Sequence, residues 1–477
     1  MSTNTLDMEA SSPWKPCDLR GVFPESVSEH LFEQVGKAIG SEVAEGGHVV
    51  VGGDFRLSTL ALKSSLIRGL VSTGLHVMDV GQAPTPVVYF TSARLAAAAV
   101  FIVTASHNPA AHNGLKWMVG ERPPTPADIQ RIQSATLSGT FRQGRGTVEV
   151  LDPVPSYREW ITSRWKHLRT ARRTRVILDA GSGAWAQLAP QVFRDLDFDI
   201  VSLHGDPDGR FPHRSPDCAR TKNLAALQAA VVDHGATLGI AWDGDGDRVA
   251  FVDEHGVHAS TDEVSILFAR QVLKSAEPGG NVVCDIKLSD SVRREVLGAG
   301  GDALLERSGH AFMRGRLLAS RALLGLDACG HYFFREGGSR DDGLYGALYM
   351  LGILGDERTL AELCQSIGPI FSTPELRLPS SILNYDVVRD RLHAEFPDAE
   401  QSNIDGTRLM LKDGVILARE SSTEAVVSLR IEGFSSRGYS ELVTRCLASL
   451  RDANNILLGQ IGELPGRVPL VSQREQP

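Results

Sequence analysis

Short runs of β-branched and other apolar residues alternate with helical periodicities along the first three quarters of the chain. Residues 49–51, 77–80 and 98–103 predict buried strands, and residues 59–73 predict a helix between the first two. Strands that alternate with amphipathic helices indicate parallel-type sheets covered by helices. The same rhythm returns in strands expected near 175–179, 238–242 and 282–286.

A helix is also expected ahead of the first strand, because Leu31, Phe32 and Val35 fall on one helical face. Ser26 and Glu29 match a capping box, in which a hydroxyl and a carboxylate three residues apart satisfy amide groups of the first helical turn. We therefore expect Ser26 to cap this helix.

The pattern changes after about residue 370. Residues 415–418 and the alternating Val427, Leu429 and Ile431 predict antiparallel hairpins, followed by a helix near 439–454. A chain of 477 residues is too long for a single hydrophobic core. We expect an α/β protein whose domains cover residues 1–150, 151–257, 258–370 and 371–477.

Charge and composition exclude several classes of protein. The chain is 42% hydrophobic and 22% charged, which is typical of globular proteins. Its net charge of −9 argues against a nucleic-acid partner, so an anionic ligand would require a local basic pocket. The six cysteines are scattered without a CxxC pair, which favours a reducing compartment.

No membrane segment or signal peptide is expected. The longest apolar stretch, residues 95–103, is too short for a bilayer, which takes roughly 20 residues. The first dozen residues are polar and acidic and lack the basic and apolar regions of a signal peptide. A cytoplasmic location is the resulting prediction.

The first stretch whose residues could take part in a reaction follows the strand 98–103. It is Thr104-Ala105-Ser106-His107-Asn108-Pro109. Ligands of open α/β sheets bind at the carboxyl ends of strands. A serine there can act only with a nearby base, or as a phosphoryl donor if it is already phosphorylated. Taken alone, the same residues favour a simple turn over a catalytic loop.

The second stretch is Asp243-Gly244-Asp245-Gly246-Asp247-Arg248, between two apolar runs. In an extended loop, side chains two residues apart point to one side, so the three carboxylates converge. Hard oxygen ligands of this kind suit an octahedral Mg²⁺. An acidic surface turn or a calcium loop is the alternative, but an EF-hand would need a later glutamate and flanking helices. Arg248 would lie beside the ion, ready for a phosphate.

Two further stretches are weaker in isolation. Residues 327–336 place Asp, Cys, Gly and His beside an aromatic run, which could present hydrogen-bonding groups to a sugar or could simply be a buried strand. Residues 419–424 combine an arginine with three hydroxyls, which fits either an anion nest or an ordinary turn.

Taken together and in this order, the four stretches resemble the α-D-phosphohexomutase family, and its phosphomannomutase/phosphoglucomutase branch most closely. The likeness extends from Asp18-Leu19-Arg20-Gly21 to the Arg419 stretch. Other matching stretches are Pro84-Thr85-Pro86, Asn113-Gly114-Leu115-Lys116, Asp208-Gly209-Arg210-Phe211-Pro212, Asp285-Ile286-Lys287, Ser308-Gly309-His310 and Asp341-Asp342-Gly343.

The resemblance implies four domains around a central cleft, namely three related mixed-sheet α/β domains and a smaller, mobile C-terminal α+β domain. It implies interconversion of hexose 6-phosphate and hexose 1-phosphate, of mannose or glucose, through a phosphoserine and a hexose 1,6-bisphosphate. The partner would be a small phosphosugar, and the protein a monomer or weak homo-oligomer.

The resemblance also implies residue roles. Ser106 would be the phosphoserine and, with Asp243, Asp245 and Asp247, would hold Mg²⁺. The remaining catalytic candidates are Arg20, His107, Lys116, Arg248 and Lys287, with Lys116 and Lys287 as general acids or bases. Sugar-binding candidates are Asp327, Cys329, His331 and His310, and the clamp for the non-transferred phosphate would be Arg419, Ser421, Ser422 and Thr423.

The sugar stretch departs from the family pattern Gly-Glu-Met-Ser-Gly-His. Asp327 shortens the carboxylate by one methylene, and Cys329 replaces a good hydrogen-bond donor with a weak one. Lost contacts to a sugar hydroxyl alter specificity strongly. Three alternatives therefore stay open: a mutase for glucosamine phosphate or a cyclitol phosphate, a catalytically silent sugar-phosphate-binding protein, and a metal-dependent phosphatase.

Overall fold

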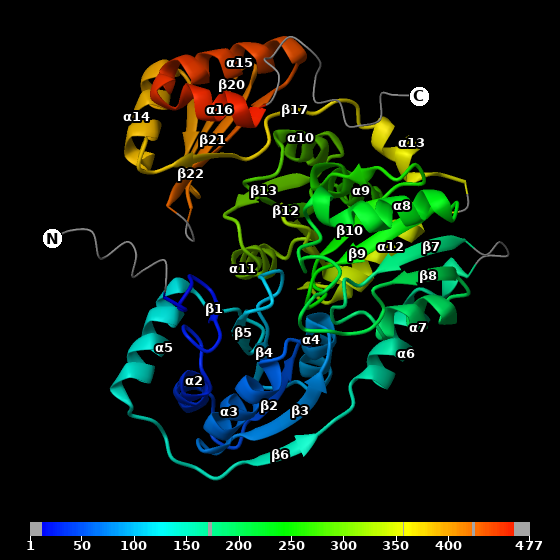
Figure 1. Ribbon diagram of the computed structural model, residues 1–477, viewed down its shortest axis with the longest axis vertical. Coiled ribbons are helices and arrows are strands. Elements are labelled where there is room, and N and C mark those ends of the chain that lie inside the picture. The colour runs from blue at the N-terminus through cyan, green and yellow to red at the C-terminus, as the bar shows by residue number, and fades with distance from the viewer. Residues whose placement is uncertain (1–11, 170–173, 356, 422–424, 462–477) are drawn as a thin grey trace. The chain divides into compact units, whose positions relative to one another are not determined.

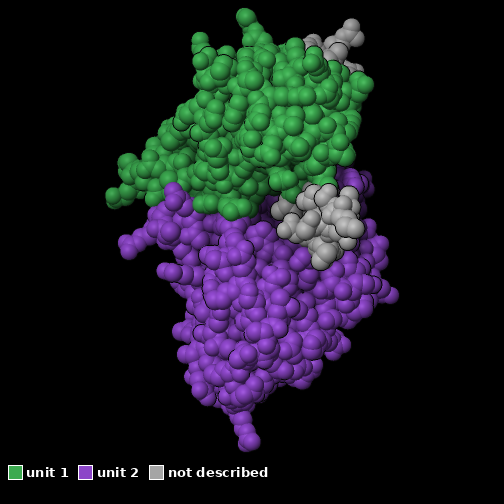
Figure 2. Space-filling model, turned by 90° about the vertical axis from the view of Figure 1, so that its left-hand side faces the viewer, with its two compact units in different colours: residues 1–10, 262–308, 364–477 green, residues 11–261, 309–363 purple. Residues whose placement is uncertain are grey.

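The computed structural model describes residues 12–169, 174–355, 357–421 and 425–461. These residues form two compact units, which Figure 2 distinguishes by colour. Among the described residues, the larger unit comprises 12–261 and 309–363, and the smaller unit comprises 262–308 and 364–461.

The first sheet of the larger unit has six strands in the order β1-β5-β4-β2-β3-β6. The strands β4, β2, β3 and β6 pair in parallel, and β5 and β1 add antiparallel pairs at one edge. The bounds are β1 (Leu19–Val22), β2 (His48–Gly53), β3 (His76–Gln82), β4 (Ala99–Val103), β5 (His112–Val119) and β6 (Thr147–Val150). The sheet is thus mixed, and the strands expected at 49–51, 77–80 and 98–103 are confirmed.

Four helices accompany this sheet: α2 (Glu29–Glu42), α3 (Thr59–Val71), α4 (Thr85–Arg94) and α5 (Pro126–Ser138). In Figure 1, α2 and α3 lie together beside β2 and β3. The prediction that Ser26 caps α2 is wrong. The N-cap is Ser28, whose hydroxyl accepts a hydrogen bond from the Leu31 amide at 3.2 Å. Ser26 instead lies in the preceding turn, where its amide donates to the Val22 carbonyl.

The second sheet of the larger unit has the order β11-β10-β9-β7-β8. Its strands are β7 (Arg175–Asp179), β8 (Asp199–Leu203), β9 (Leu238–Trp242), β10 (Val249–Val252) and β11 (His258–Ala259), with helices α6 (Val154–Arg164), α7 (Leu188–Asp195) and α8 (Ala225–Asp233) nearby. β9 and β10 are fully buried and antiparallel, with Trp242 opposite Val249. Their connecting loop is the acidic stretch 243–248.

The rest of the larger unit is a short antiparallel ladder with two helices. The elements are α11 (His310–Ser320), β14 (Leu324–Leu326), β15 (Tyr332–Phe334), β16 (Arg340–Asp341) and α12 (Gly343–Leu354). Leu326 pairs with Tyr332, so residues 327–331 form a tight loop between β14 and β15. The aromatic run expected to be a buried strand is indeed β15.

The smaller unit contains a parallel pair, β12 (Asn281–Asp285) and β13 (Asp302–Glu306), and a separate antiparallel sheet. That sheet has the order β17-β22-β21-β20-β19, and β18 also pairs with β22. Its strands are β17 (Phe371–Ser372), β18 (Leu376–Pro379), β19 (Glu400–Ser402), β20 (Thr407–Leu411), β21 (Gly414–Glu420) and β22 (Val426–Gly433). The helices are α9 (Thr261–Lys274), α10 (Asp290–Gly298), α14 (Tyr385–Glu395), α15 (Ser436–Ser449) and α16 (Asn454–Ile461), and α13 (Leu360–Gln365) lies where the chain passes between the units.

The antiparallel hairpins expected after residue 370 are confirmed by β20, β21 and β22. The helix expected at 439–454 is α15, which ends at Ser449 and is followed by a separate helix, α16. Apolar side chains of these strands and of α14, α15 and α16 form one core. Within the part of the chain that the structure describes, no helix is long and apolar enough to cross a bilayer.

Candidate active site

The acidic loop between β9 and β10 brings three buried carboxylates together. Ligand oxygens of Asp243, Asp245 and Asp247 lie within 4.8 Å of one another. Hydrogen bonds within the loop stabilise its turn. The amides of Gly246 and Arg248 both donate to Oδ1 of Asp243, at 3.0 and 3.2 Å. Gly246 is required here: its φ is +85°, and a Cβ would lie 2.3 Å from the indole nitrogen of Trp185.

The charge of this cluster is balanced by Lys116, which reaches it from β5. Its ammonium group lies 2.8 Å from Oδ2 of Asp245 and 2.5 Å from Oδ2 of Asp247. Burial alone would lower the pKa of Lys116, but the two carboxylates raise it well above its usual range. Burial raises the pKa of Asp247, whereas Lys116 and His331 together hold it well below the usual range. Burial and the neighbouring Asp245 and Asp247 raise the pKa of Asp243 to about 8.

Ser106 lies in contact with this loop. Its hydroxyl donates a hydrogen bond of 2.7 Å to Oδ2 of Asp243, although the two residues are 137 positions apart. Ser106 is 1% exposed and has a φ of +51°, a conformation that is uncommon outside glycine. A Cβ at Gly244 would lie 2.6 Å from the Ser106 carbonyl oxygen, so the loops could not approach this closely with another residue there. The serine and the acidic loop therefore form one site.

Two predicted catalytic residues flank the serine. Nδ1 of His107 lies 3.4 Å from Oγ of Ser106, and burial, with Arg248 next in size, lowers the pKa of His107 well below its usual value. His107 is therefore neutral near pH 7. Arg20, on β1, donates to Asn108 of the serine loop at 3.2 Å and to Asp18 at 2.6 Å. A guanidinium held in this way keeps further N–H groups for a phosphate.

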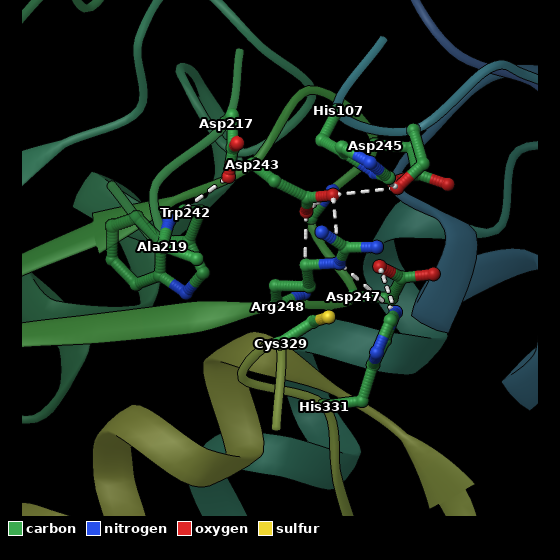
Figure 3. Close-up of polar contacts among 12 residues, drawn as sticks. His107, Asp217, Ala219, Trp242, Asp243, Asp245, Asp247, Arg248, Cys329 and His331 are labelled. Carbon is green, nitrogen blue, oxygen red and sulfur yellow. Dashed lines mark hydrogen bonds and ion pairs between the residues drawn. The ribbon is translucent and has the colours of Figure 1, made fainter. Parts of the chain in front are cut away.

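The loop 327–331, which we call the predicted sugar loop, is joined to the acidic loop through Arg248 and His331 (Figure 3). Nε2 of His331 lies 3.2 Å from Oδ1 of Asp247 and 3.2 Å from Nε of Arg248. Burial alone would lower the pKa of His331, but Asp247, followed by Asp327, raises it well above its usual range. Oδ1 of Asp327 accepts from the Cys329 amide at 2.5 Å, which fixes the shape of the loop.

His310 lies at the first position of α11, with its ring centroid 6.2 Å from that of His331. Burial, followed by the nearby Lys116 charge, lowers the pKa of His310 to about 3, so the ring is neutral at physiological pH. A neutral imidazole carries one donor and one acceptor nitrogen, which suits a sugar hydroxyl.

The remaining predicted residues belong to the smaller unit. Arg419, on β21, donates to Asp405 at 2.5 Å. Ser421 directly follows β21, and its amide donates to the Val426 carbonyl. Lys287 follows β12, and its carbonyl accepts from Arg430 at 2.6 Å. Ser422 and Thr423 lie outside the described residues. The structure thus brings the serine loop, the acidic loop and the predicted sugar loop together in the larger unit. Arg419, Ser421 and Lys287 belong to the smaller unit.

Several supporting residues were not predicted. Thr85, at the start of α4, donates to Oδ2 of Asp245 at 2.8 Å, and the Trp185 indole donates to the Gly246 carbonyl at 2.7 Å. Asp405 accepts the hydrogen bond from Arg419. A signal for Thr85 existed in the matching stretch 84–86, whereas nothing local in the sequence distinguishes Trp185 from any other core residue.

The acidic cluster also fits a divalent cation. Oδ1 of Asp245 is buried and has no hydrogen-bond partner among the described residues, so one carboxylate oxygen remains available. Three carboxylates and a serine oxygen are the hard ligands that Mg²⁺ prefers. A second group, Asp247, His331 and Asp341, also has its ligand atoms within 4.8 Å of one another.

Comparison with known proteins gives matches along nearly all of the chain. Residues 15–143, 155–256 and 260–370 match domains I, II and III of "Phosphoglucomutase/phosphomannomutase, alpha/beta/alpha", and residues 383–448 match the C-terminal domain. The chain is 33% identical over 450 residues to the phosphomannomutase/phosphoglucomutase of Pseudomonas aeruginosa, covering 93% of this chain and 96% of that protein.

A phosphoglucomutase of Neisseria gonorrhoeae is 30% identical over 453 residues, with 93% of this chain and 98% of that protein covered. A crystal structure of a phosphoglucomutase/phosphomannomutase family protein from Burkholderia thailandensis superimposes with a TM-score of 0.84 at 32% identity, covering 93% of this chain and 98% of that one. The chain therefore belongs to the phosphoglucomutase/phosphomannomutase family, with three α/β domains and a C-terminal domain.

Proposed function

We propose that this protein is a phosphohexomutase that interconverts hexose 6-phosphate and hexose 1-phosphate, with glucose or mannose as the sugar. The observation that carries the proposal is the hydrogen bond from Ser106 to Asp243, because it joins a buried hydroxyl to a buried acidic cluster. Family membership supports the reaction class, and the relatives named above are phosphomannomutases and phosphoglucomutases.

Phosphorylated Ser106 would donate its phosphoryl group to the unphosphorylated position of the sugar. The bond between phosphorus and Oγ breaks, a bond to the sugar oxygen forms, and the proton of the sugar hydroxyl passes to a base. The product is a hexose 1,6-bisphosphate, which turns around and returns its other phosphoryl group to Oγ of Ser106, while the bond from that phosphorus to the sugar oxygen breaks and the oxygen takes a proton from the acid group. Lys116 and Lys287 are the proposed acid and base groups, and such transfer depends mainly on positioning and charge neutralisation.

Asp243, Asp245, Asp247 and the Ser106 oxygen would hold Mg²⁺. The ion, when bound, neutralises charge on the transferring phosphoryl group. Arg20 and Arg248 supply further positive charge beside the serine, and His107 adds a neutral hydrogen-bonding ring. His310, His331, Asp327 and Cys329 are proposed to bind the sugar. Arg419, Ser421, Ser422 and Thr423 are proposed to bind the phosphate that is not transferred.

The position of Asp327 bears on the choice of sugar. Its carboxylate accepts from the Cys329 amide and lies 3.3 Å from Nδ1 of His331, so it shapes the loop from inside. We expect glucose and mannose phosphates to be substrates. Domain boundaries near 150, 257 and 370 remain our proposal, as do a cytoplasmic location and a monomer or weak homo-oligomer.

The test is turnover of glucose 1-phosphate, mannose 1-phosphate and glucosamine 1-phosphate by the purified chain, with Mg²⁺ and a trace of glucose 1,6-bisphosphate. Ser106→Ala should abolish turnover and should remove a covalent phosphate that intact-mass measurement finds in the native protein. Thr136→Ala, on the half-buried last turn of α5, is a hydroxyl deletion that should leave both unchanged.

Other results would favour the alternatives. Activity on glucosamine phosphate alone would indicate a specialised mutase. Phosphate release that matches isomer formation would indicate a phosphatase. No turnover and no phosphoserine after incubation with the bisphosphate would indicate a silent binding protein.

A further inference from the structure

A buried arginine lies beneath the Ser106 loop and has no part in the predicted site. Arg56 follows β2, is 1% exposed, and directs its guanidinium at four backbone carbonyls. Nη2 donates to Ser106 at 2.8 Å and to Asn108 at 2.6 Å, and Nη1 donates to Pro109 at 2.7 Å and to His112 at 3.0 Å. One side chain therefore donates to four backbone carbonyls within residues 106–112.

Arg56 is also linked to the backbone amide of Ser106, through Asp54 and Thr104. Nε of Arg56 donates to Oδ2 of Asp54 at 3.1 Å, and the Thr104 hydroxyl donates to the same oxygen at 2.7 Å. That hydroxyl in turn accepts from the Ser106 amide at 2.9 Å. Both the N–H and the C=O of Ser106 are thus held by the Asp54–Arg56 pair. Because a positive φ in a non-glycine residue persists only when its surroundings enforce it, this double restraint explains how Ser106 keeps a φ of +51°.

The stretch 208–212, which matched the family without an assigned role, packs on this arginine. A Cβ at Gly209 would lie 2.5 Å from the Arg56 Cα, so the two backbones touch. The Phe211 ring lies over the guanidinium, with 5.1 Å between Cζ and the ring centroid. The Phe211 side chain also borders Gly244 of the acidic loop. Arg56 is therefore enclosed between the serine loop and the segment that follows β8.

We propose that Arg56 is a positioning residue for phosphoryl transfer, which holds the Ser106 backbone in register with the acidic loop. The proposal rests on the proposed role of Ser106 as the phosphoryl carrier. Lysine cannot replace this arginine, because an ammonium group is a compact donor and cannot span four carbonyls and a carboxylate as a planar guanidinium does.

The first test compares Arg56→Lys with Arg142→Lys. Arg142 is a matched control, since it also donates to three carbonyls of the same unit, those of Thr73, Val43 and Gly40, but lies away from the serine loop. Both variants should lose thermal stability. Only Arg56→Lys should lower kcat for glucose 1-phosphate, on the order of 100-fold, because a small misplacement of a reacting group costs about that much.

The KM for glucose 1-phosphate should change far less than kcat in Arg56→Lys, since the ground-state contacts of the sugar are untouched. Equal losses of kcat in both lysine variants, or an unchanged kcat in Arg56→Lys, would overturn the proposal and leave Arg56 a structural residue.

The second test removes the link on the amide side of Ser106. Thr104→Val deletes the hydroxyl that joins the Ser106 amide to Asp54 while preserving volume, and should lower kcat. Thr104→Ser restores the hydroxyl and should recover most of it. Recovery by serine is the signature of positioning, and equal kcat values in the valine and serine variants would contradict it.

A third measurement does not depend on catalysis. Amide hydrogen exchange in residues 104–112 should accelerate in Arg56→Lys and Thr104→Val but not in Arg142→Lys. If the native protein neither carries phosphate nor turns over sugar phosphates, the proposed function fails. The exchange comparison still decides whether Arg56 holds the loop: unchanged exchange would overturn this part of the inference.

Discussion

At the scale of the residue, Lys116 supplies a positive charge that pairs with two carboxylates of the acidic loop. Lys116 is 2% exposed and bridges Asp245 and Asp247 of the acidic loop. Its removal would take one positive charge from a cluster of three buried carboxylates, which would leave His331 and Arg248 to balance them less completely. Breaking one side of a buried ion pair costs about 3–5 kcal/mol, which makes Lys116 a stability determinant as well as a catalytic candidate.

We predict that Lys116→Met lowers the thermal midpoint in chelator and that Mg²⁺ raises this midpoint by more than it does in the native chain. The reason is that a cation then relieves carboxylate repulsion that Lys116 normally relieves. Thermal denaturation with EDTA and with Mg²⁺ measures the two increments.

Lys63→Met is the control, because Lys63 pairs with Asp79 away from the acidic loop. This control should lose stability without gaining Mg²⁺ dependence. Equal Mg²⁺ increments in all three proteins would contradict the predicted compensation.

Asp342, the N-cap of α12, provides a prediction about pH. Its carboxylate accepts from the Tyr157 hydroxyl at 2.7 Å, and burial raises its pKa to about 6. Because the pKa of Asp342 is higher in the folded protein than in the unfolded chain, protonation of this carboxyl group stabilises the fold. The stabilisation is fully present below about pH 4, near the pKa of the unfolded chain, and is lost as pH rises through 6.

Asp342→Asn keeps the shape of the side chain but cannot ionise. Its stability relative to the native chain should therefore improve between pH 5 and pH 7.5 by about 1.4 kcal/mol, because only the one unit from pH 5 to the folded pKa of about 6 lies in this window. Urea unfolding at the two pH values measures the difference. A constant difference would show that Asp342 does not titrate in this range.

At the scale of elements, the local pattern placed strands well and helix ends less well. The β-branched runs at 49–51 and 98–103 became β2 and β4 because continuous burial leaves them no other role. The capping box at Ser26 and Glu29 failed because Ser28 is an equally good cap three residues before a helical amide. Choosing between two such serines depends on the turn that Ser26 makes with Val22.

The cap can be tested directly. Ser28→Ala should cost about 1 kcal/mol of unfolding free energy because the Leu31 amide loses its partner. Ser26→Ala, the matched control, should cost clearly less, since the Ser26 contact to Val22 uses the backbone amide. Chemical denaturation of both variants gives the comparison. The opposite order would restore Ser26 as the cap.

At the scale of the whole molecule, each compact unit is built from segments that are not continuous in the sequence. Residues 262–308 pack with the C-terminal part of the chain in the smaller unit. Arg430 of β22 donates to Asp262 of α9 and to the Lys287 carbonyl, both at 2.6 Å. Glu432 accepts from Ser289 at 2.7 Å. These contacts join the antiparallel sheet to the segment that contains the catalytic candidate Lys287.

Arg430→Met should therefore weaken this unit by about 2 kcal/mol, the worth of hydrogen bonds to charged groups. Amide exchange should rise in residues 262–290 together with the residues around β22. Arg437→Met removes an exposed pair with Glu441 and should cost clearly less than Arg430→Met, without changing exchange in 262–290. Faster exchange around β22 alone would show that the two segments open independently.

The residues of the candidate site also differ in how far they could be predicted from the sequence. The three aspartates were predictable from residue types alone, because their short loop suits a metal ion. Ser106, Lys116 and His331 were expected only from the family resemblance of the whole set of stretches. Trp185 and Asp405 were not predicted at all, since each acts through a partner distant in sequence and its residue type carries no signal alone.

The amino-acid sequence by itself determined the order of strands and helices, the serine and acidic loops, and the residue types available for chemistry, because periodicity and loop composition are local properties. Only the tertiary structure decided that the hydroxyl of Ser106 meets Asp243, that Lys116 balances the acidic loop, and that Arg56 holds the serine loop. Such contacts join residues 50 to 137 positions apart. They depend on sheet order and strand register, which no short window of sequence contains.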